Sequence, residues 1–343
     1  MSHLKRLQVL GGVMAAAMLV AACSSTAAPS AGASAPSAGA SAPSTNAAGP
    51  SAAGPGKKVA MLFPGLVDDQ SWNQAGFAGL KRAETETGAQ ISYTEKVTQD
   101  QQVEVFRKYA QLGNEVIIGH GGEYMDAALQ VAAEFPAVQF VVTNGNKSAA
   151  NVTSLALNYG DMGYLSGVLA CSVTKSNKIG VVIGETIPIA NDSVKGWENG
   201  CKRVNPNAKV KVSVTGDWAD VDKSREAALA LIADGADVVG HLLDAADAGV
   251  FAAAEDKGVQ AIGLYGDQKK LGPKSHIGAA IADASLVVFR AATGALDGGV
   301  HLEGVKEGVV TFGAFADSVP KAVVDAVKTA QDDLLSGKVT FGG

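Results

Sequence analysis

The sequence predicts an α/β protein with two doubly wound lobes, on three observations. The chain of 343 residues is long enough for two domains, and its 47% hydrophobic content fits a globular class. From Lys57 onward, short apolar runs typical of buried strands alternate with longer amphipathic stretches. The alternation forms two series, and each places crossover helices on both faces of a parallel sheet.

The first series predicts four strands separated by three helices. In chain order these are strand 58–63, helix 73–87, strand 89–95, helix 100–112, strand 115–119, helix 124–134 and strand 138–143. Each strand is a short apolar run, and each helix shows apolar residues at helical spacing. This series predicts the first parallel sheet.

The second series has the same character and predicts the second sheet. It contains helix 161–174, strand 178–183, helix 191–204, strand 209–214, helix 221–234, strand 237–241, helix 247–257 and strand 259–264. Strand 275–281, helix 283–296, strand 308–312 and helix 319–335 remain, too few for a third lobe. We expect an N-terminal lobe of residues 57–158 and 267–312, and a C-terminal lobe of residues 159–266 and 313–343.

The amino terminus has the pattern of an export signal. Lys5 and Arg6 precede an apolar run, 7–22, which is shorter than the roughly 20 residues that span a bilayer. Small residues end directly at Cys23, as in a bacterial lipobox, in which the cysteine is lipidated after the preceding peptide is removed. We expect 1–22 to be a signal peptide and Cys23 to be lipidated. The alternative is an ordinary signal peptide with Cys23 incidental.

Residues 23–56 follow as a linker. After Cys23 the segment contains only Ser, Ala, Pro, Gly, Thr and one Asn, a composition that cannot build a core. A flexible chain of this length has a root-mean-square reach of about 30 Å. We therefore expect a receptor anchored by lipid on the extracytoplasmic face of the cell membrane.

Composition also excludes several classes of function. A net charge of -6 lacks the basic footprint of a protein that binds nucleic acids. The three cysteines have no CxxC spacing, which argues against zinc ribbons and thioredoxin-like sites. His120 and His241 end strands, but no catalytic motif accompanies them. We expect no catalysis, no metal and no cofactor.

Candidate binding residues follow the carboxyl ends of the strands, where doubly wound sheets bind ligands. These segments are 64–74, 120–123 and residue 144 in the first lobe, and 184–188, 216–220, 244–247 and 265–268 in the second. Trp72 and Trp218 occupy equivalent places in opposite lobes, where their rings could enclose a planar ligand. The alternative is that both pack at helix starts. Trp197 lies inside an expected helix and is interpreted as a packing residue.

Six short motifs, in order and spacing, carry a resemblance to a known family. They are Asp-Gln-Ser-Trp-Asn-Gln at 69–74, Tyr-Leu-Ser-Gly at 164–167, the glycine-spaced segment 180–188, Asn-Pro at 205–206, Gly-Asp-Trp-Ala-Asp at 216–220, and 263–268. This pattern resembles the basic membrane protein family of lipoproteins, purine-nucleoside receptors of bacterial ABC importers. The resemblance implies a type I periplasmic-binding-protein fold, with two lobes joined by three hinge crossings.

The resemblance also implies roles for individual residues. Asp69 and Asn73 would hydrogen-bond the base or its sugar, Trp72 and Trp218 would replace paired phenylalanines, and Asp267 would bind ribose hydroxyls or base edges. Gly121, Asn144 and Asp244 complete the expected ligand-binding set. The family usually carries a lysine shortly after the strand equivalent to 275–281, and this chain has none there.

We therefore expect a monomeric receptor that captures a small ligand, most simply a purine nucleoside, and delivers it to an ABC permease and its ATPase. The alternatives are a receptor for a pentose-type sugar and a ligand-sensing lipoprotein of the same fold. We also expect a disulfide between Cys171 and Cys201, which lie on helices flanking one strand. Its alternative is two buried free thiols.

Overall fold

The computed structural model describes residues 56–69, 72–294 and 298–341, all within one compact unit, Ala52–Gly343. The expected signal peptide, 1–22, the lipidated Cys23 and the linker up to residue 55 lie outside the described residues. No described helix has the length and apolar character required to cross a membrane.

The first lobe is built on a six-stranded parallel sheet in the order β11-β5-β4-β3-β1-β2. Its strands are β1 (Lys58–Leu62), β2 (Gln90–Thr94), β3 (Val116–His120), β4 (Gln139–Thr143), β5 (Val152–Leu157) and β11 (Gly299–Glu303). Its helices are α1 (Trp72–Thr87), α2 (Gln102–Gln111), α3 (Met125–Ala132), with a short 3-10 turn, η1 (Gly122–Tyr124), before it, and α8 (Ala284–Thr293).

Alternate side chains of β1 are buried on opposite faces of this sheet. Val59 and Met61 belong to the core with Leu80 of α1, whereas Ala60 and Leu62 pack with the core that α2 and α3 complete. Because successive side chains of a strand point to opposite faces, helices on both sides are needed to bury them.

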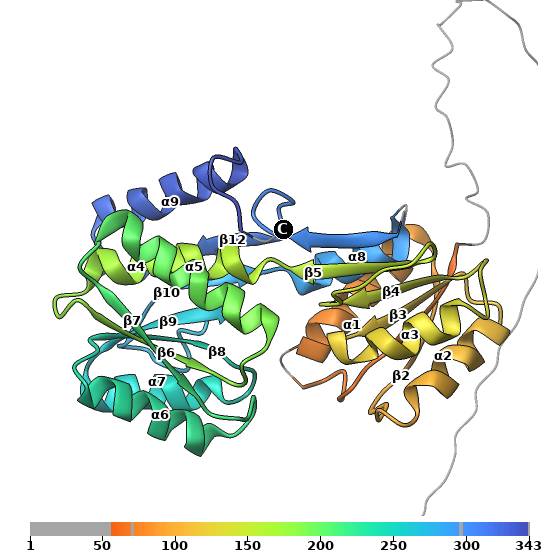
Figure 1. Cartoon of the computed structure of the whole chain (residues 1–343), viewed down its shortest axis with the longest axis horizontal. Coiled ribbons are helices and arrows are strands. Elements are labelled where there is room, and N and C mark those ends of the chain that lie inside the picture. The colour runs from red at the N-terminus through yellow and green to blue at the C-terminus, as the bar shows by residue number, and fades with distance from the viewer. Residues whose placement is uncertain (1–55, 70–71, 295–297, 342–343) are drawn as a thin grey trace, which may run out of the picture. The chain divides into compact units, whose positions relative to one another are not determined.

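The second lobe has a six-stranded sheet in the order β12-β10-β9-β8-β6-β7, in which β12 is antiparallel to β10. Its strands are β6 (Lys178–Ile183), β7 (Lys209–Val214), β8 (Val238–Leu242), β9 (Gln260–Tyr265), β10 (His276–Ala282) and β12 (Val310–Gly313). Its helices are α4 (Tyr159–Val173), α5 (Pro188–Val204), α6 (Val221–Ala233), α7 (Asp247–Lys257) and α9 (Lys321–Leu335). The two sheets confirm the predicted doubly wound fold (Figure 1).

Two details differ from the sequence prediction. The expected N-terminal lobe included residues 267–312, but β10 pairs with β9 and β12 pairs with β10, so both strands belong to the second sheet. The physical reason is that β10 follows β9 after a short loop and pairs beside it. The prediction also missed β5 and β11, which pair with each other in the first sheet.

Within the described residues the chain passes between the sheets at three places: at Asn158, at Asp283 and at 304–309. These crossings are hydrogen-bonded together. The Asn158 amide donates to the Glu303 carbonyl at 3.0 Å, and the Asp283 amide donates to the Val309 carbonyl at 2.9 Å. The crossings therefore form one connected strip rather than three independent linkers.

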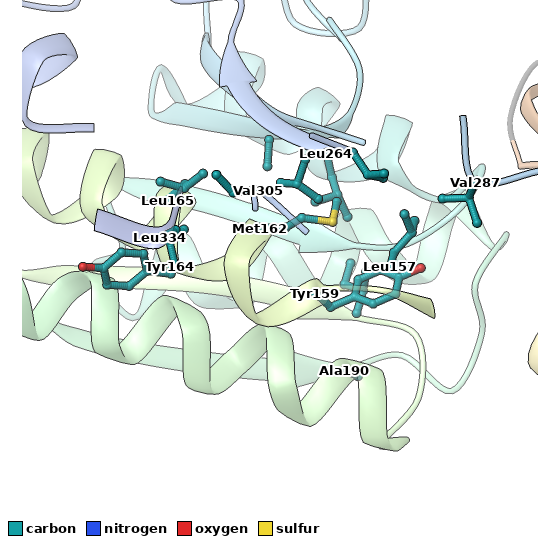
Figure 2. Packing of buried hydrophobic residues seen from close by; sticks show 14 of the residues in the cluster. Leu157, Tyr159, Met162, Tyr164, Leu165, Ala190, Leu264, Val287, Val305 and Leu334 are labelled. Atoms are coloured by element: carbon teal, nitrogen blue, oxygen red, sulfur yellow. The ribbon is translucent and has the colours of Figure 1, made fainter. Parts of the chain in front are cut away.

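The first and third crossings share a buried carboxylate. Asp161, in the first turn of α4, accepts a hydrogen bond from the Val305 amide at 2.9 Å, and burial raises the pKa of Asp161 to about 6. Figure 2 shows Leu157, Tyr159 and Met162 in the same buried cluster as Val305. Apolar packing and hydrogen bonding thus hold the same part of the molecule.

Helices α4 and α5 approach each other closely. A Cβ atom on Gly167 would lie only 2.2 Å from the Trp197 carbonyl oxygen, so glycine permits this contact. Trp197 is buried in the adjacent core, which confirms it as a packing residue. The expected disulfide is present between the same helices, with the Cα atoms of Cys171 and Cys201 5.0 Å apart.

Candidate ligand-binding cavity

A cavity of about 850 Å³ lies at the carboxyl ends of strands from both lobes. Seven of the eight predicted binding residues line it: Asp69, Trp72, Asn73, Gly121, Asn144, Trp218 and Asp244. Its volume is that of a pocket for a small organic molecule, and both polar and aromatic side chains reach it.

Trp72 is supported on one face by His120. The two rings are stacked, with centroids 4.3 Å apart and planes inclined by 6°. Trp72 begins α1, and His120 ends β3. Because the imidazole covers one face of the indole, the ring is held in a fixed orientation at the cavity wall.

His120 itself is neutral. Burial lowers its pKa to about 4, because the charged imidazolium is costly away from water. Nε2 lies 2.9 Å from the Trp72 carbonyl oxygen, and a carbonyl only accepts, so Nε2 carries the proton. The Thr143 hydroxyl, 3.1 Å from Nδ1, then donates to that nitrogen. These two bonds fix the imidazole behind Trp72.

Trp218 is supported differently, by backbone. A Cβ atom on Gly184 would lie 2.4 Å from the indole ring, so the ring rests directly on the chain after β6. The Trp218 carbonyl also accepts hydrogen bonds from the amides of Asp244 and Ala246, at 3.0 and 3.2 Å. Trp218, which follows β7, therefore contacts the segment that follows β6 and the segment that follows β8.

Asp69 organises the start of α1. Its carboxylate accepts hydrogen bonds from the Asn73 amide at 3.1 Å, the Asn73 side chain at 2.7 Å and the Gln74 amide at 3.0 Å. These bonds satisfy donors that the helix itself leaves unpaired. Asp69 thus orients Asn73 at the cavity wall.

Gly121 turns the chain out of β3 with a φ of 141°, a conformation that favours glycine. A Cβ atom at this position would lie 2.2 Å from a carboxylate oxygen of Glu123. Burial of Glu123, together with the charge of Asp244, raises the pKa of its carboxyl group. Gly121 therefore contributes to the site by giving space to Glu123.

The Asn144 side chain is hydrogen-bonded to residues beside the first crossing. Its Oδ1 accepts from the Leu157 amide at 3.1 Å, and its Nδ2 donates to the Tyr159 hydroxyl at 3.1 Å. Tyr159 is also hydrogen-bonded to Tyr265, and burial raises its pKa to about 12. The two tyrosines come from α4 and β9, and both line the cavity.

Tyr265 has a backbone φ of 67°, in the left-handed region that a bulky side chain rarely adopts. Such strain persists only where surrounding structure holds the residue, and it is concentrated at functional sites. Tyr265 is one of the residues that line the cavity.

Asp244 lines the cavity, and its side chain is exposed there. Partial loss of water around the carboxyl group, and the negative charges of Asp69 and Asp247, raise the pKa of Asp244 to about 6. Asp69 comes from the first lobe and Asp244 from the second. Acidic side chains from both lobes therefore act on one another at this site.

The structure does not bring Asp267 to the cavity, and its expected role in ligand binding stays a prediction. Asp267 is exposed, does not line the cavity, and accepts a hydrogen bond from the Lys269 amide at 2.9 Å. The neighbouring Gln268 instead points into the second lobe. Its Oε1 lies 3.0 Å from His241 Nε2, and the Nε2 of Gln268 donates a hydrogen bond to Asp247. The strand-end rule located the segment but did not determine which side chain points inward.

Other lining residues were not singled out from the sequence. Glu123, Glu185 and Tyr265 lie in segments that the sequence marked as candidates, 120–123, 184–188 and 265–268, but were not named as binding residues. Tyr159 and Asp192 lie on helices outside those segments, where position after a strand gives no signal. Among the described residues, no group of His, Cys, Asp and Glu is arranged to hold a metal ion.

Two lobes with a cavity at the carboxyl ends of their strands define a solute-binding protein. The family described as ABC transporter substrate-binding protein PnrA-like, the Bmp family, matches residues 56–342, and the chain belongs to it. Proteins of this family are extracytoplasmic receptors of ABC transporters and are not enzymes. The resemblance noted in the sequence is thereby confirmed.

Three curated relatives are similar over most of their length. The transcriptional activator protein med of Bacillus subtilis is 28% identical, over 77% of this chain and 84% of its own. A purine-binding protein of Brucella abortus is 27% identical over 82% of each chain. The ABC transporter nucleoside-binding protein BmpA of Lactococcus lactis is 29% identical, over 80% of this chain and 85% of its own.

Solved structures agree with the fold. An ABC transporter solute-binding protein from Conexibacter woesei has a TM-score of 0.67 and 25% identity, covering 83% of this chain and 98% of its own. A transcriptional activator of the comK gene from Bacillus halodurans has a TM-score of 0.73 and 26% identity, covering 83% of this chain and all of its own. The type I periplasmic-binding-protein fold is therefore confirmed.

Proposed function

We propose that this protein is a lipid-anchored receptor that captures a purine nucleoside in the cavity and delivers it to an ABC permease. The observation that carries the proposal is the pair Trp72 and Trp218, which line one cavity from opposite lobes. Each ring has one face backed by protein. A planar base would stack between the free faces, and each such stack contributes about 1 to 3 kcal/mol.

The polar residues of the cavity suit the sugar of a nucleoside. Asp69 and Asp244 are carboxylates, which accept hydrogen bonds from adjacent hydroxyls when ionised. The relatives named as purine-binding and nucleoside-binding support the same ligand class. A pentose is the alternative, since the carboxylates alone would serve it and the indoles would then stack on a sugar face.

A ligand panel tests the proposal. Thermal melts of the full chain are recorded with purine nucleosides, free purine bases and pentoses, each at rising concentration. A ligand at 100 times its dissociation constant stabilises the folded state by about 2.7 kcal/mol. We expect stabilisation by at least one purine nucleoside. Stabilisation by pentoses alone would replace the nucleoside with the sugar, and no response to either class would defeat both.

The membrane anchor needs its own test, because residues 1–55 lie outside the described structure. We propose that Cys23 is lipidated after removal of residues 1–22. Cys23→Ser should move the protein from the membrane fraction to the soluble fraction and abolish palmitate labelling. Labelling that persists in this variant would contradict the anchor and leave the ligand proposal untouched.

A further inference from the structure

The cavity carries an excess of negative charge. Five acidic side chains line it, and no Lys, Arg or His is found among its described lining residues. The five are Asp69, Glu123, Glu185, Asp192 and Asp244. Asp192 is paired with Lys195 at 3.3 Å, and Asp69 accepts N–H donors at the start of α1. Glu123, Glu185 and Asp244 have no ion-pair partner in the described part of the chain.

Three of these carboxyl groups act on one another across the site. The charge of Asp69 raises the pKa of Asp244, and the charge of Asp244 raises the pKa of Glu123. Asp69 and Glu123 belong to the first lobe and Asp244 to the second. A positive charge between the lobes would relieve this repulsion, and a negatively charged ligand would increase it.

Asn73 provides an independent observation. This side chain lines the cavity and is only 8% exposed, and its Oδ1 has no hydrogen-bond partner among the described residues. A buried acceptor without a partner is costly, so it favours a ligand with an N–H or O–H donor. The cavity therefore presents carboxylates, and one of its lining residues holds a buried acceptor without a partner, so a ligand that supplies donors is favoured.

The tryptophans fit a positively charged ring. Indole is the side chain that binds cations most strongly through its face, and this attraction grows when water is excluded. The group behind Trp72 does not oppose it, because His120 is neutral. The group behind Trp218 is the backbone at Gly184, which carries no net charge. Both free faces can therefore act on a cation.

We infer that the cavity selects a cationic purine nucleoside, one whose ring is positively charged because a ring nitrogen is methylated. The inference rests on the proposed function, and it specifies the charge of the ligand. Methylation at N1 of adenosine makes the ring basic enough to be protonated at neutral pH. Methylation at N7 of guanosine places a positive charge on the ring, which is a net cation as long as N1 keeps its proton, on the acid side of neutrality. Both retain the ribose and the planar base.

The test compares isomers that differ in charge. Calorimetry on the full chain at pH 7.5 measures 1-methyladenosine, a cation, and N6-methyladenosine, its neutral isomer. We expect the cation to bind at least tenfold more tightly. The pair 7-methylguanosine and guanosine, compared at pH 6.5 where the methylated base keeps its N1 proton and is a cation, checks that the preference does not depend on the position of one methyl group.

Variants separate charge from shape. In the double variant Glu123→Gln, Asp244→Asn, the ratio of the two affinities should fall at least fivefold; loss of a ribose contact at Asp244 would weaken both isomers alike and would leave the ratio unaffected. Asp222→Asn removes an exposed carboxylate of α6 outside the cavity and should leave the ratio unchanged. Melting curves of each variant confirm that it is folded.

Equal binding of the isomers, or a ratio unchanged in the double variant, would overturn the inference and leave a receptor for neutral nucleosides. Failure of every nucleoside to bind would instead defeat the proposed function. If choline bound under those conditions and the double variant lost it, the preference for a cation would stand without the nucleoside.

Discussion

The two lobes support their cavity tryptophans in different ways. Trp72 of the first lobe lies on a side chain, the neutral imidazole of His120, which is itself held by two hydrogen bonds. Trp218 of the second lobe lies on the backbone at Gly184, and its own carbonyl holds the segment that contains Asp244. The second lobe also has the Cys171–Cys201 disulfide. A cavity tryptophan can thus be supported by a side chain, which a single substitution removes, or by backbone, which a substitution cannot remove.

The largest expected effect concerns stability and is confined to the second lobe. The disulfide closes a loop of sequence separation 30, which stabilises the fold by about 3 to 4 kcal/mol in the chain-entropy model. Reduction should lower the melting temperature, because the unfolded chain gains freedom. Ligand affinity should stay within about twofold, since neither cysteine lines the cavity. A reduced protein that melts at the same temperature would contradict this account.

The tryptophans should differ in what their loss costs. Trp218→Ala exposes only backbone, so we expect affinity to fall about 10- to 100-fold, the equivalent of one stack. Trp72→Ala exposes the His120 ring, which offers a second flat surface, so we expect a smaller loss of about tenfold. Calorimetry measures both, with Trp→Phe variants as controls that keep a ring. Normal binding by both alanine variants would make the indoles packing residues.

The backbone support of Trp218 can be disturbed by one methyl group. Gly184→Ala would place a Cβ atom 2.4 Å from the indole, so the ring must shift. We expect affinity to fall about fivefold to tenfold through this overpacking. Gly266→Ala is the matched control, because a Cβ atom there meets nothing within 4 Å. Equal affinities of the two variants would show that the position of the indole is unimportant.

A smaller effect concerns Asp244, which faces Asp69, Glu123, Asp247, Tyr159 and Tyr265. Its folded pKa of about 6 exceeds the roughly 3.9 of an unfolded aspartate, so the folded state binds this proton more tightly. The resulting stability is present below about pH 4 and is lost as pH rises through 6. Asp244→Asn should therefore melt about 1 to 3 °C above wild type at pH 7 and equal it near pH 4. A wild-type protein that melts at a higher temperature than Asp244→Asn at pH 7 would contradict this prediction, because ionised Asp244 would then stabilise the fold.

The smallest expected effect is a titration that does not occur. Because burial lowers the pKa of His120 to about 4, its imidazole should remain neutral, with the proton on Nε2, from pH 5.5 to 8. Nitrogen chemical shifts of the ring, assigned by comparison with His120→Gln, measure this directly. A shift change centred near pH 6.5 would mean that Trp72 lies on a cation for part of that range.

The sequence predicted the alternation of strands and helices because burial on both faces of a parallel sheet leaves a strong apolar pattern. It missed β11, whose Val300 and Leu302 are exposed and whose pattern is weak. At the site, position after a strand identified Trp72, Trp218 and Asp244. It did not give side-chain direction: the structure does not bring Asp267 to the cavity, and the neighbouring Gln268 points into the second lobe.

The support of each indole was also beyond sequence reasoning. His120 lies 48 positions from Trp72, and Gly184 lies 34 positions before Trp218, so their contacts depend on how strands are ordered in each sheet. Asn144 shows the same limitation. Its position after β4 is that of a binding residue, but both of its polar side-chain atoms are used by the first crossing.

A crystal structure of the chain with the nucleoside that stabilises it most would test the central claim directly. The account predicts a planar base stacked between Trp72 and Trp218, with ribose hydroxyls donating to carboxylates of the cavity. A base bound out of contact with both indoles would contradict it.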